Sequence, residues 1–279
     1  MLRAVSPVSG AITHQREYTV KDHLGNLRLA YRAGRRLTYF AGLEPGDASR
    51  ETQQFDSASV SAPVAQSVGA NPATSRARTG THVARLHAGG PAPQPLGALK
   101  QLGVQRGDTV LVTAHGLYPQ ATSGSPFLFS LASFVAGLLQ PAPGVPGGAD
   151  GRRRGGLPLL SIGVSAALPA LVPRSGGVPL GYVRLLVFNA DSNLVSSQTQ
   201  QLSSAALNNY EDLQLQVVVP QDGYVTAYVG NESDADVFFD DVAVVHGQGL
   251  QVQENQYDPW GLSLAGLDYA SPEIGRAHV

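Results

Sequence analysis

Short segments in which apolar and polar residues alternate recur along much of this chain. The clearest cover residues 81–86, 102–105, 107–115, 182–188, 213–219, 224–229 and 237–244. A two-residue period is typical of β-strands that bury one face, and turn residues rich in Gly and Pro separate the segments. The pattern predicts an all-β protein built around an antiparallel β-sandwich.

A β-hairpin is predicted near the start of the chain. Residues 17–21 and 27–31 alternate polar and apolar side chains on either side of Gly25 and Asn26. Both of these residues tolerate the positive φ that a two-residue hairpin turn requires. We therefore expect the hairpin to turn at this pair.

Two segments lack strand alternation. Residues 41–75 are rich in Ser, Ala, Pro, Gln and Gly and are predicted to be a linker or loop, with a candidate first strand at 51–55. Residues 127–140 are apolar, but a membrane span needs about 20 residues. A short buried or docking helix is the preferred interpretation, inside a helical and loop insertion over 127–181, and membrane insertion is the alternative.

Composition narrows the function classes. Only 14% of the residues are charged and the net charge is −2, so bulk electrostatics attract neither nucleic acid nor an anionic membrane. Cysteine is absent, which excludes disulfides, thiolate metal sites and a thiol nucleophile. The first residues lack a continuous apolar stretch, so we predict no signal peptide within this chain.

Signatures of catalysis are missing from the sequence. It holds no Gly-x-Ser-x-Gly elbow and no His-Glu-x-x-His metal motif. The seven histidines are scattered without ligand spacing: His14, His23, His82, His87, His115, His246 and His278. We predict a protein that is not an enzyme.

Two distant segments carry a family resemblance. Residues 21–28 read Lys-Asp-His-Leu-Gly-Asn-Leu-Arg, and residues 254–262 read Glu-Asn-Gln-Tyr-Asp-Pro-Trp-Gly-Leu. Together they resemble one core unit of Rhs/YD-repeat proteins of the Bacteroidota type, split by an insertion and with Trp260 in place of the more usual Phe. The resemblance implies strands of a β-sheet shell in a secreted or cell-surface, polymorphic-toxin-like bacterial protein. Its partners would be the remainder of the shell and a C-terminal effector, and its export signal would lie outside this chain.

The second of these segments has an alternative interpretation. Residues 258–262 also match the Asp-Pro-x-Gly-Leu motif at which the core of this family cuts itself. The Arg-(Phe/Trp)-x-Ser-Pro-Asp-Pro segment that normally precedes that motif is absent, so a core strand is preferred over self-cleavage.

The inserted region has a resemblance of its own. Residues 78–82, 107–109 and 239–242 are similar to strands of the galactose-binding-like jelly roll of carbohydrate-binding modules. This implies a jelly-roll sandwich over 76–247, inserted between Rhs-core strand segments at 1–40 and 248–272.

Asp240 and three tyrosines are the candidate site residues. Strict alternation would place Asp240 on the apolar face of its strand, where a carboxylate must be hydrogen-bonded, paired or bound to a cation. Structural hydrogen bonding is the preferred interpretation. The jelly-roll resemblance implies a structural calcium ion as the alternative, with Glu51 or Asp56 as distant co-ligands, and no other cofactor is predicted. Sugar binding needs aromatic platforms beside polar groups, and the candidates are Tyr118, Tyr224 and Tyr228, which are otherwise packing residues.

The expected function is a non-catalytic structural or binding segment of an Rhs/YD-repeat protein, and the alternative is a glycan-binding module on the cell surface. Residues 273–279, Glu-Ile-Gly-Arg-Ala-His-Val, look like a translated sequencing-adapter oligonucleotide rather than native sequence. An ordinary frayed C-terminus is the alternative for this tail.

Overall fold

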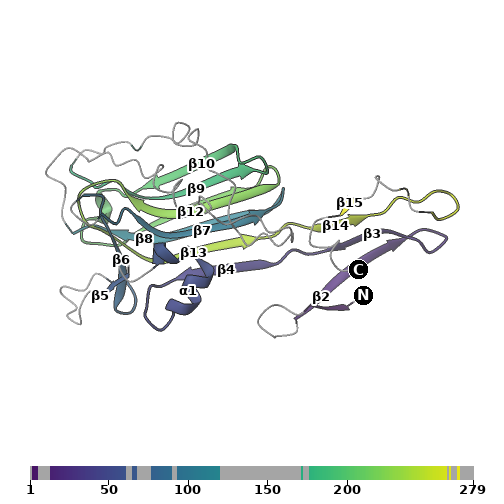
Figure 1. Cartoon of the computed structure of the whole chain (residues 1–279), viewed down its shortest axis with the longest axis horizontal. Coiled ribbons are helices and arrows are strands. Elements are labelled where there is room, and N and C mark those ends of the chain that lie inside the picture. Colours follow the sequence, from purple (N-terminus) through teal and green to yellow (C-terminus); the bar gives the residue numbers. More distant parts are fainter. Residues whose placement is uncertain are drawn as a thin grey trace, which may run out of the picture.

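The computed structural model describes residues 2–5, 13–60, 65–67, 77–89, 93–119, 171, 176–262, 264 and 269–270. Within these residues the fold is all-β, and its named strands pair antiparallel, as the alternation predicts. Two sheets pack into a sandwich, and a smaller sheet extends to one side of it (Figure 1).

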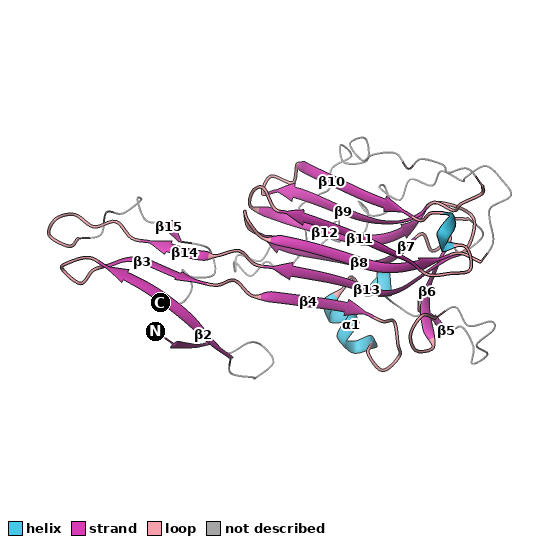
Figure 2. Ribbon diagram, turned by 180° about the vertical axis from the view of Figure 1, so that it is seen from behind, coloured by secondary structure: helices cyan, strands magenta, loops and turns pink. Residues whose placement is uncertain are grey.

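The sandwich packs a four-stranded sheet against a six-stranded one (Figure 2). The four-stranded sheet has the order β10 (Leu194–Gln201), β9 (Gly181–Asn189), β12 (Gly223–Asn231), β7 (Leu96–Val104). The other has the order β11 (Glu211–Val218), β8 (Thr109–Leu117), β13 (Val237–Gly247), β6 (His82–Leu86), β5 (Ala65–Ser67), and β4 (Arg36–Ala41) also pairs with β13.

The main core lies between these two sheets. Strand β8 shows why: its even-numbered residues from 110 to 116 are buried while the odd-numbered ones are partly exposed, as expected for a strand with one buried face. The core residues predicted from alternation are all buried: Val110, Val112, Leu185, Val187, Val217, Val225 and Val242. The jelly-roll type of antiparallel sandwich predicted for this region is therefore confirmed as the fold class.

The small sheet joins strands from both ends of the chain. Its order is β1 (Leu2–Val5), β2 (Thr13–Lys21), β3 (Leu27–Arg32), β14 (Gln251–Glu254), β15 (Tyr269–Ala270). The strands of the sandwich lie between β3 and β14 in the sequence.

A two-stranded ribbon connects the small sheet to the sandwich. Arg36 faces Gly247 in the sandwich, and four residues further along each strand Arg32 faces Gln251 in the small sheet. The register is therefore unchanged across the junction. There the backbone N–H of Gln248 donates to the carbonyl of Arg35 at 2.8 Å.

The predicted hairpin is confirmed, but its turn is longer than expected. Strands β2 and β3 pair directly, and the turn spans residues 22–26 instead of the Gly25-Asn26 pair. Gly25 alone adopts positive φ there, at 88°. Asp22 donates its backbone N–H to the carbonyl of Asn26, so the loop between these two residues has three members, 23–25. A three-residue loop with glycine in the left-handed region is another common hairpin connection, and it is followed by a bulge.

Asp22 explains the longer turn. Its Oδ1 accepts the backbone N–H groups of Leu24 and Asn26 at 3.0 and 2.9 Å. Its Oδ2 accepts Asn26 Nδ2 and Arg28 Nε, both at 3.1 Å. One carboxylate therefore accepts hydrogen bonds from donors along the whole loop. A two-residue turn would not need such a side chain.

One prediction for the connecting segments is wrong. The candidate strand at 51–55 is wrong: residues 48–54 form helix α1 (Ala48–Gln54), whose Arg, Glu and Gln residues favour helix. A 3₁₀ helix follows at Ser57–Val60, and another lies at Ser204–Ala206.

The predicted helix at 127–140 and the tail at 273–279 lie outside the described residues. The domain boundaries stay predictions, and among the described helices none is long and apolar enough to cross a membrane.

Candidate functional site

The side of the four-stranded sheet that points away from the six-stranded sheet carries a second cluster. On β9 and β12 the residues Leu185, Val187, Val225 and Ala227 enter the core between the sheets, so their neighbours point the opposite way. We call this second side the outer face. Its described residues include Leu96, Leu99, Gln101, Tyr182, Arg184, Leu186, Phe188, Ser197, Thr199, Tyr224, Thr226 and Tyr228.

Strand register places three polar side chains of the outer face in one line across the sheet. Ser197 on β10 faces Leu186 on β9, which faces Thr226 on β12, which faces Gln101 on β7. We call Ser197, Thr226 and Gln101 the polar row. Neighbouring strands lie about 4.8 Å apart, so the row crosses all four strands over about 14 Å.

The polar atoms of this row are buried and lack partners. Within the described part of the chain, Ser197 Oγ, Thr226 Oγ1 and Gln101 Nε2 make no hydrogen bond. Leaving a buried donor or acceptor unpaired costs about 1–3 kcal/mol per group. Three such groups in one line therefore indicate that this face is more than apolar packing.

Aromatic rings flank the polar row on both sides. Tyr224 stacks on Phe188 with ring centroids 4.8 Å apart, and Tyr228 meets Tyr182 edge to face at 6.1 Å. The hydroxyls of Tyr224 and Tyr228 are buried, that of Tyr224 beside the side chain of Ser192 and that of Tyr228 beside those of Arg184 and Tyr182. Burial raises the pKa of both tyrosines, so the hydroxyls stay protonated and able to donate.

A charged group lies at one end of the outer face. Arg184 donates through Nε to Thr199 Oγ1 at 2.9 Å, and its guanidinium carbon lies 4.7 Å from the ring centroid of Tyr182. The Tyr182 hydroxyl donates to Glu232 Oε1 at 2.8 Å. Arg184 is 2% exposed and Glu232 is 9% exposed, so both charges are largely removed from water.

The three tyrosines predicted as ligand platforms do not lie together. Tyr224 and Tyr228 share the outer face, whereas Tyr118 belongs to the core between the two sheets. All three are buried rather than exposed, and Leu171, from the connection between β8 and β9, packs in the same cluster as Tyr224 and Tyr228.

Sequence reasoning missed the polar row. Its three members lie on β7, β10 and β12, and only the pairing of those strands shows that they share a line. One signal was available, because Thr226 sits between Tyr224 and Tyr228 at the spacing of residues that share a strand face.

Asp240 is buried and hydrogen-bonded, but on a different side of its strand from the one that strict alternation predicts. The pairing of β13 with β8 shifts between Asp240 and Ala243, and Asp241 adopts a φ of 50°. This bulge reverses the alternation. Phe239 and Val242 therefore face the main core, and Asp240 does not.

The surroundings of Asp240 do not fit a calcium ion. Its Oδ2 accepts the backbone N–H groups of Arg78 and Thr79 at 2.7 and 3.1 Å, and its Oδ1 accepts that of Asp241 at 2.8 Å. Calcium needs six to eight oxygen ligands, whereas these neighbours present N–H donors. Burial raises the pKa of Asp240, although the N–H groups of Thr79 and Arg78 oppose the shift.

The proposed co-ligands lie elsewhere. Glu51 Oε1 accepts the backbone N–H groups of Gly42 and Leu43 at 2.8 and 3.1 Å, and Asp56 Oδ1 accepts that of Ala58 at 3.1 Å. In the part of the chain that the structure describes, no group of three or more His, Asp or Glu residues is arranged to hold a metal ion.

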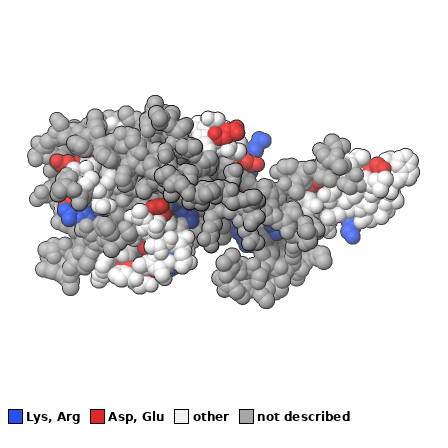
Figure 3. Space-filling view, in the orientation of Figure 1, with Lys and Arg blue, Asp and Glu red and all other residues white. Residues whose placement is uncertain are grey.

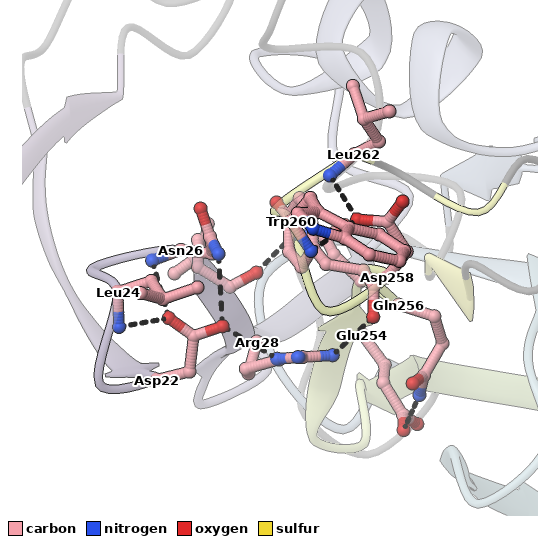
Figure 4. A network of polar contacts seen from close by, with 12 residues as sticks. Asp22, Leu24, Asn26, Arg28, Glu254, Gln256, Asp258, Trp260 and Leu262 are labelled. Atoms are coloured by element: carbon pink, nitrogen blue, oxygen red, sulfur yellow. Dashed lines mark hydrogen bonds and ion pairs between the residues drawn. The ribbon is translucent and has the colours of Figure 1, made fainter.

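The two segments that resemble an Rhs core unit lie side by side in the small sheet (Figure 4). The backbone N–H of Asn255 donates to the carbonyl of Arg28 at 3.0 Å, and Asn255 Nδ2 donates to the carbonyl of Leu27 at 2.9 Å. The guanidinium carbon of Arg28 lies 5.3 Å from the centroid of the Tyr257 ring. Segments more than two hundred residues apart in sequence thus form one structural unit.

Asp258 is engaged in a turn of its own. Its Oδ1 accepts the backbone N–H groups of Trp260 and Leu262 at 2.9 and 2.8 Å. This carboxylate shapes the loop in the same way that Asp22 shapes the neighbouring hairpin. Beside it, Trp260 is 84% exposed. On the face that Figure 3 shows, most of the described surface of the small sheet is neither acidic nor basic.

Comparison with known proteins leaves the family open. No protein-family model and no curated protein matches the chain. Among solved structures, the CBM22-1–GH10 modules of Clostridium thermocellum endo-1,4-beta-D-xylanase 10B, complexed with xylohexaose, align with a TM-score of 0.34 and 9% identity over 68% of this chain and 25% of that chain. The chain therefore spans about a quarter of that structure.

Two further structures are similar at the same level. A module titled "Family 16 Carbohydrate Binding Module-2" aligns with a TM-score of 0.29 and 11% identity over 60% of this chain and 79% of that one. The CBM22-1 xylan-binding domain of Paenibacillus barcinonensis Xyn10C aligns with a TM-score of 0.29 and 9% identity over 62% and 78%. Similarity this distant identifies neither a family nor a function for this chain.

Proposed function

We propose that this chain is a non-catalytic binding segment whose sandwich holds a glycan across the polar row. The observation that carries the proposal is the line of three buried polar atoms without partners, on Ser197, Thr226 and Gln101. A polyhydroxylated ligand supplies both donors and acceptors, and so it would satisfy all three groups. The buried hydroxyls of Tyr224 and Tyr228 flank the row.

The aromatic residues support the same ligand class. Binding sites for small molecules combine apolar and aromatic walls with a few placed polar groups, and the outer face has this composition. Sugar rings offer apolar faces as well as hydroxyls, so they match tyrosine rings that border a polar line. A ligand that reaches the row displaces Leu171, which now packs in this cluster.

Binding of the whole chain to a panel of immobilised oligosaccharides tests this function. We expect saturable binding to at least one glycan and a five- to tenfold loss of affinity in Ser197→Ala, which removes one hydrogen-bonding group worth about 1 kcal/mol. Ser196→Ala is the matched control, because Ser196 is the next residue of β10 and points to the other side of the strand. Equal losses in both variants, or no saturable binding by the unaltered chain, would contradict the proposal.

A second role is supported by the small sheet. The packing of Asn255 against Leu27 and Arg28 supports the interpretation that residues 21–28 and 254–262 are one Rhs/YD-repeat core unit interrupted by the sandwich. In that role the chain is a structural segment of a larger secreted or cell-surface shell, and the sandwich is the part that it presents. Isolation of the native protein from its source, followed by mass spectrometry of its full sequence, tests this: further core strands on both sides support it, and unrelated flanking domains contradict it.

A further inference from the structure

The described outer face carries one positive and one negative side chain, whose charges offset each other. Among the described residues of this face, the charged side chains are Arg184 on β9 and Glu232 just beyond the end of β12. Lys100 lies on neighbouring β7, but its ammonium group stacks over the ring of Tyr39, a residue packed against the main core.

Tyr182 links the two charges. Its ring lies beside the guanidinium group of Arg184, with 4.7 Å between the guanidinium carbon and the ring centroid. Its hydroxyl donates to Glu232 at 2.8 Å. Burial disfavours the charge of Arg184, but Tyr228, Tyr182 and Glu232 outweigh that effect and hold the Arg184 pKa above its usual value. Arg184 is therefore a permanent cation whose charge is offset inside the site.

Arg184 is close to the polar row. It precedes Leu186, the β9 member of the line that joins Ser197 to Thr226, by two residues, which is about 6.6 Å along a strand. A carboxylate on a ligand in the row would feel both charges, because neither is screened by bulk water at this depth. The two opposite charges leave the site without a net electrostatic preference for an anion.

We propose that the polar row takes an uncharged glycan and that Glu232 sets this preference by offsetting Arg184. The proposal rests on the glycan-binding function proposed above. Glu232 acts here through Arg184 and Tyr182, so it is a positioning and selectivity residue. With its charge removed, Arg184 would be an uncompensated buried cation that attracts a uronic acid carboxylate.

The test compares neutral and uronate-bearing oligosaccharides of the same length by calorimetry on the whole chain. The unaltered chain should bind the neutral oligosaccharide at least tenfold more tightly, because a buried carboxylate loses its hydration and gains no net attraction from the balanced pair. Glu232→Gln keeps an oxygen acceptor for the Tyr182 hydroxyl but removes the charge. In this variant the ratio of neutral to uronate affinity should fall at least tenfold, and uronate binding should weaken with added salt. Glu254→Gln, the same substitution on the exposed small sheet, should leave the ratio unchanged.

A double variant separates charge from folding. Arg184→Gln combined with Glu232→Gln removes both charges and should restore the preference for the neutral glycan, which a purely structural role of Glu232 would not produce. An unchanged ratio in Glu232→Gln, or equal binding of both glycans by the unaltered chain, overturns the selectivity proposal and leaves glycan binding intact. Failure to bind either glycan overturns the proposed function itself.

Discussion

The side-chain amide of Asn255 donates to the carbonyl of Leu27 at 2.9 Å, although the two residues are 228 positions apart in the sequence. The same asparagine binds the carbonyl of Arg28 through its backbone N–H. These bonds continue the pairing of β14 with β3 at the end of β3 that lies away from the sandwich. The ribbon of β3–β4 against β13–β14 keeps one register across the junction, so the sandwich and the small sheet depend on the same pairing.

Asn255→Ala should loosen the small sheet and leave the sandwich intact. The variant loses the side-chain hydrogen bond to Leu27, worth about 1 kcal/mol, and also the one that Asn255 Oδ1 accepts from Gln253 Nε2. Hydrogen exchange of the backbone amides in β3 should therefore become about fivefold faster, while exchange in β8 and β13 stays the same. Asn193→Ala, which alters an exposed amide in a sandwich loop, is the control and should change neither region. Faster exchange in β8 would show that the two parts do not unfold separately.

Thr226→Val should stabilise the fold and weaken ligand binding at once. The substitution replaces a buried hydroxyl without a partner by a methyl group of similar size, so the free energy of unfolding should rise by about 1 kcal/mol. If the polar row binds a glycan, affinity should fall about five- to tenfold in the same variant. Thr113→Val, on the solvent side of β8, is the matched control and should change neither quantity. A gain in stability with unchanged glycan affinity would identify the outer face as ordinary core.

The alternation of apolar and polar residues predicted those features that depend on the local sequence alone. The hairpin and the buried valines of β8, β9 and β12 follow from a two-residue period, and the structure confirms them. The side on which Asp240 lies could not be predicted, because the bulge at Asp241 reverses the alternation. The carboxylate of Asp241 accepts hydrogen bonds from the side chains of Arg78 and Thr79, which are far away in sequence. Long-range pairing likewise creates the polar row, and no single strand contains it.

Asp240→Asn should destabilise the protein even though the side chains have nearly the same shape. Both carboxylate oxygens accept backbone N–H groups, so the amide group of asparagine must face a donor from Arg78, Thr79 or Asp241. A mismatched buried donor costs about 1–3 kcal/mol, and denaturant unfolding should show a loss of this size. Asp191→Asn, in an exposed loop, is the control and should unfold like the unaltered chain. Stability equal to that of the unaltered chain would mean that Asp240 is not held by these donors.

Asp108 should make the junction between the sandwich and the small sheet sensitive to acid. Its Oδ1 accepts the backbone N–H of Gly249 at 2.7 Å, and its Oδ2 lies 2.8 Å from Nε2 of His246 and 3.0 Å from the backbone nitrogen of Gln105. Burial favours the neutral acid, but the hydrogen bonds from His246, Gln105 and Gly249, together with the charge of His246, outweigh it and lower the Asp108 pKa below its usual value of 3.8.

A carboxyl group whose pKa is lower in the folded state stabilises the fold at pH values above its pKa in the unfolded state. That stabilisation is lost as the pH falls through the pKa of the folded state. Asp108→Asn should therefore cost about 2 kcal/mol at pH 7 and progressively less below pH 3.8. Denaturant unfolding of both proteins across this range measures the difference, and amide exchange at Gly249 reports whether the junction opens first. The same difference between the two proteins at pH 7 and at pH 2.5 would show that the charge of Asp108 does not hold the junction.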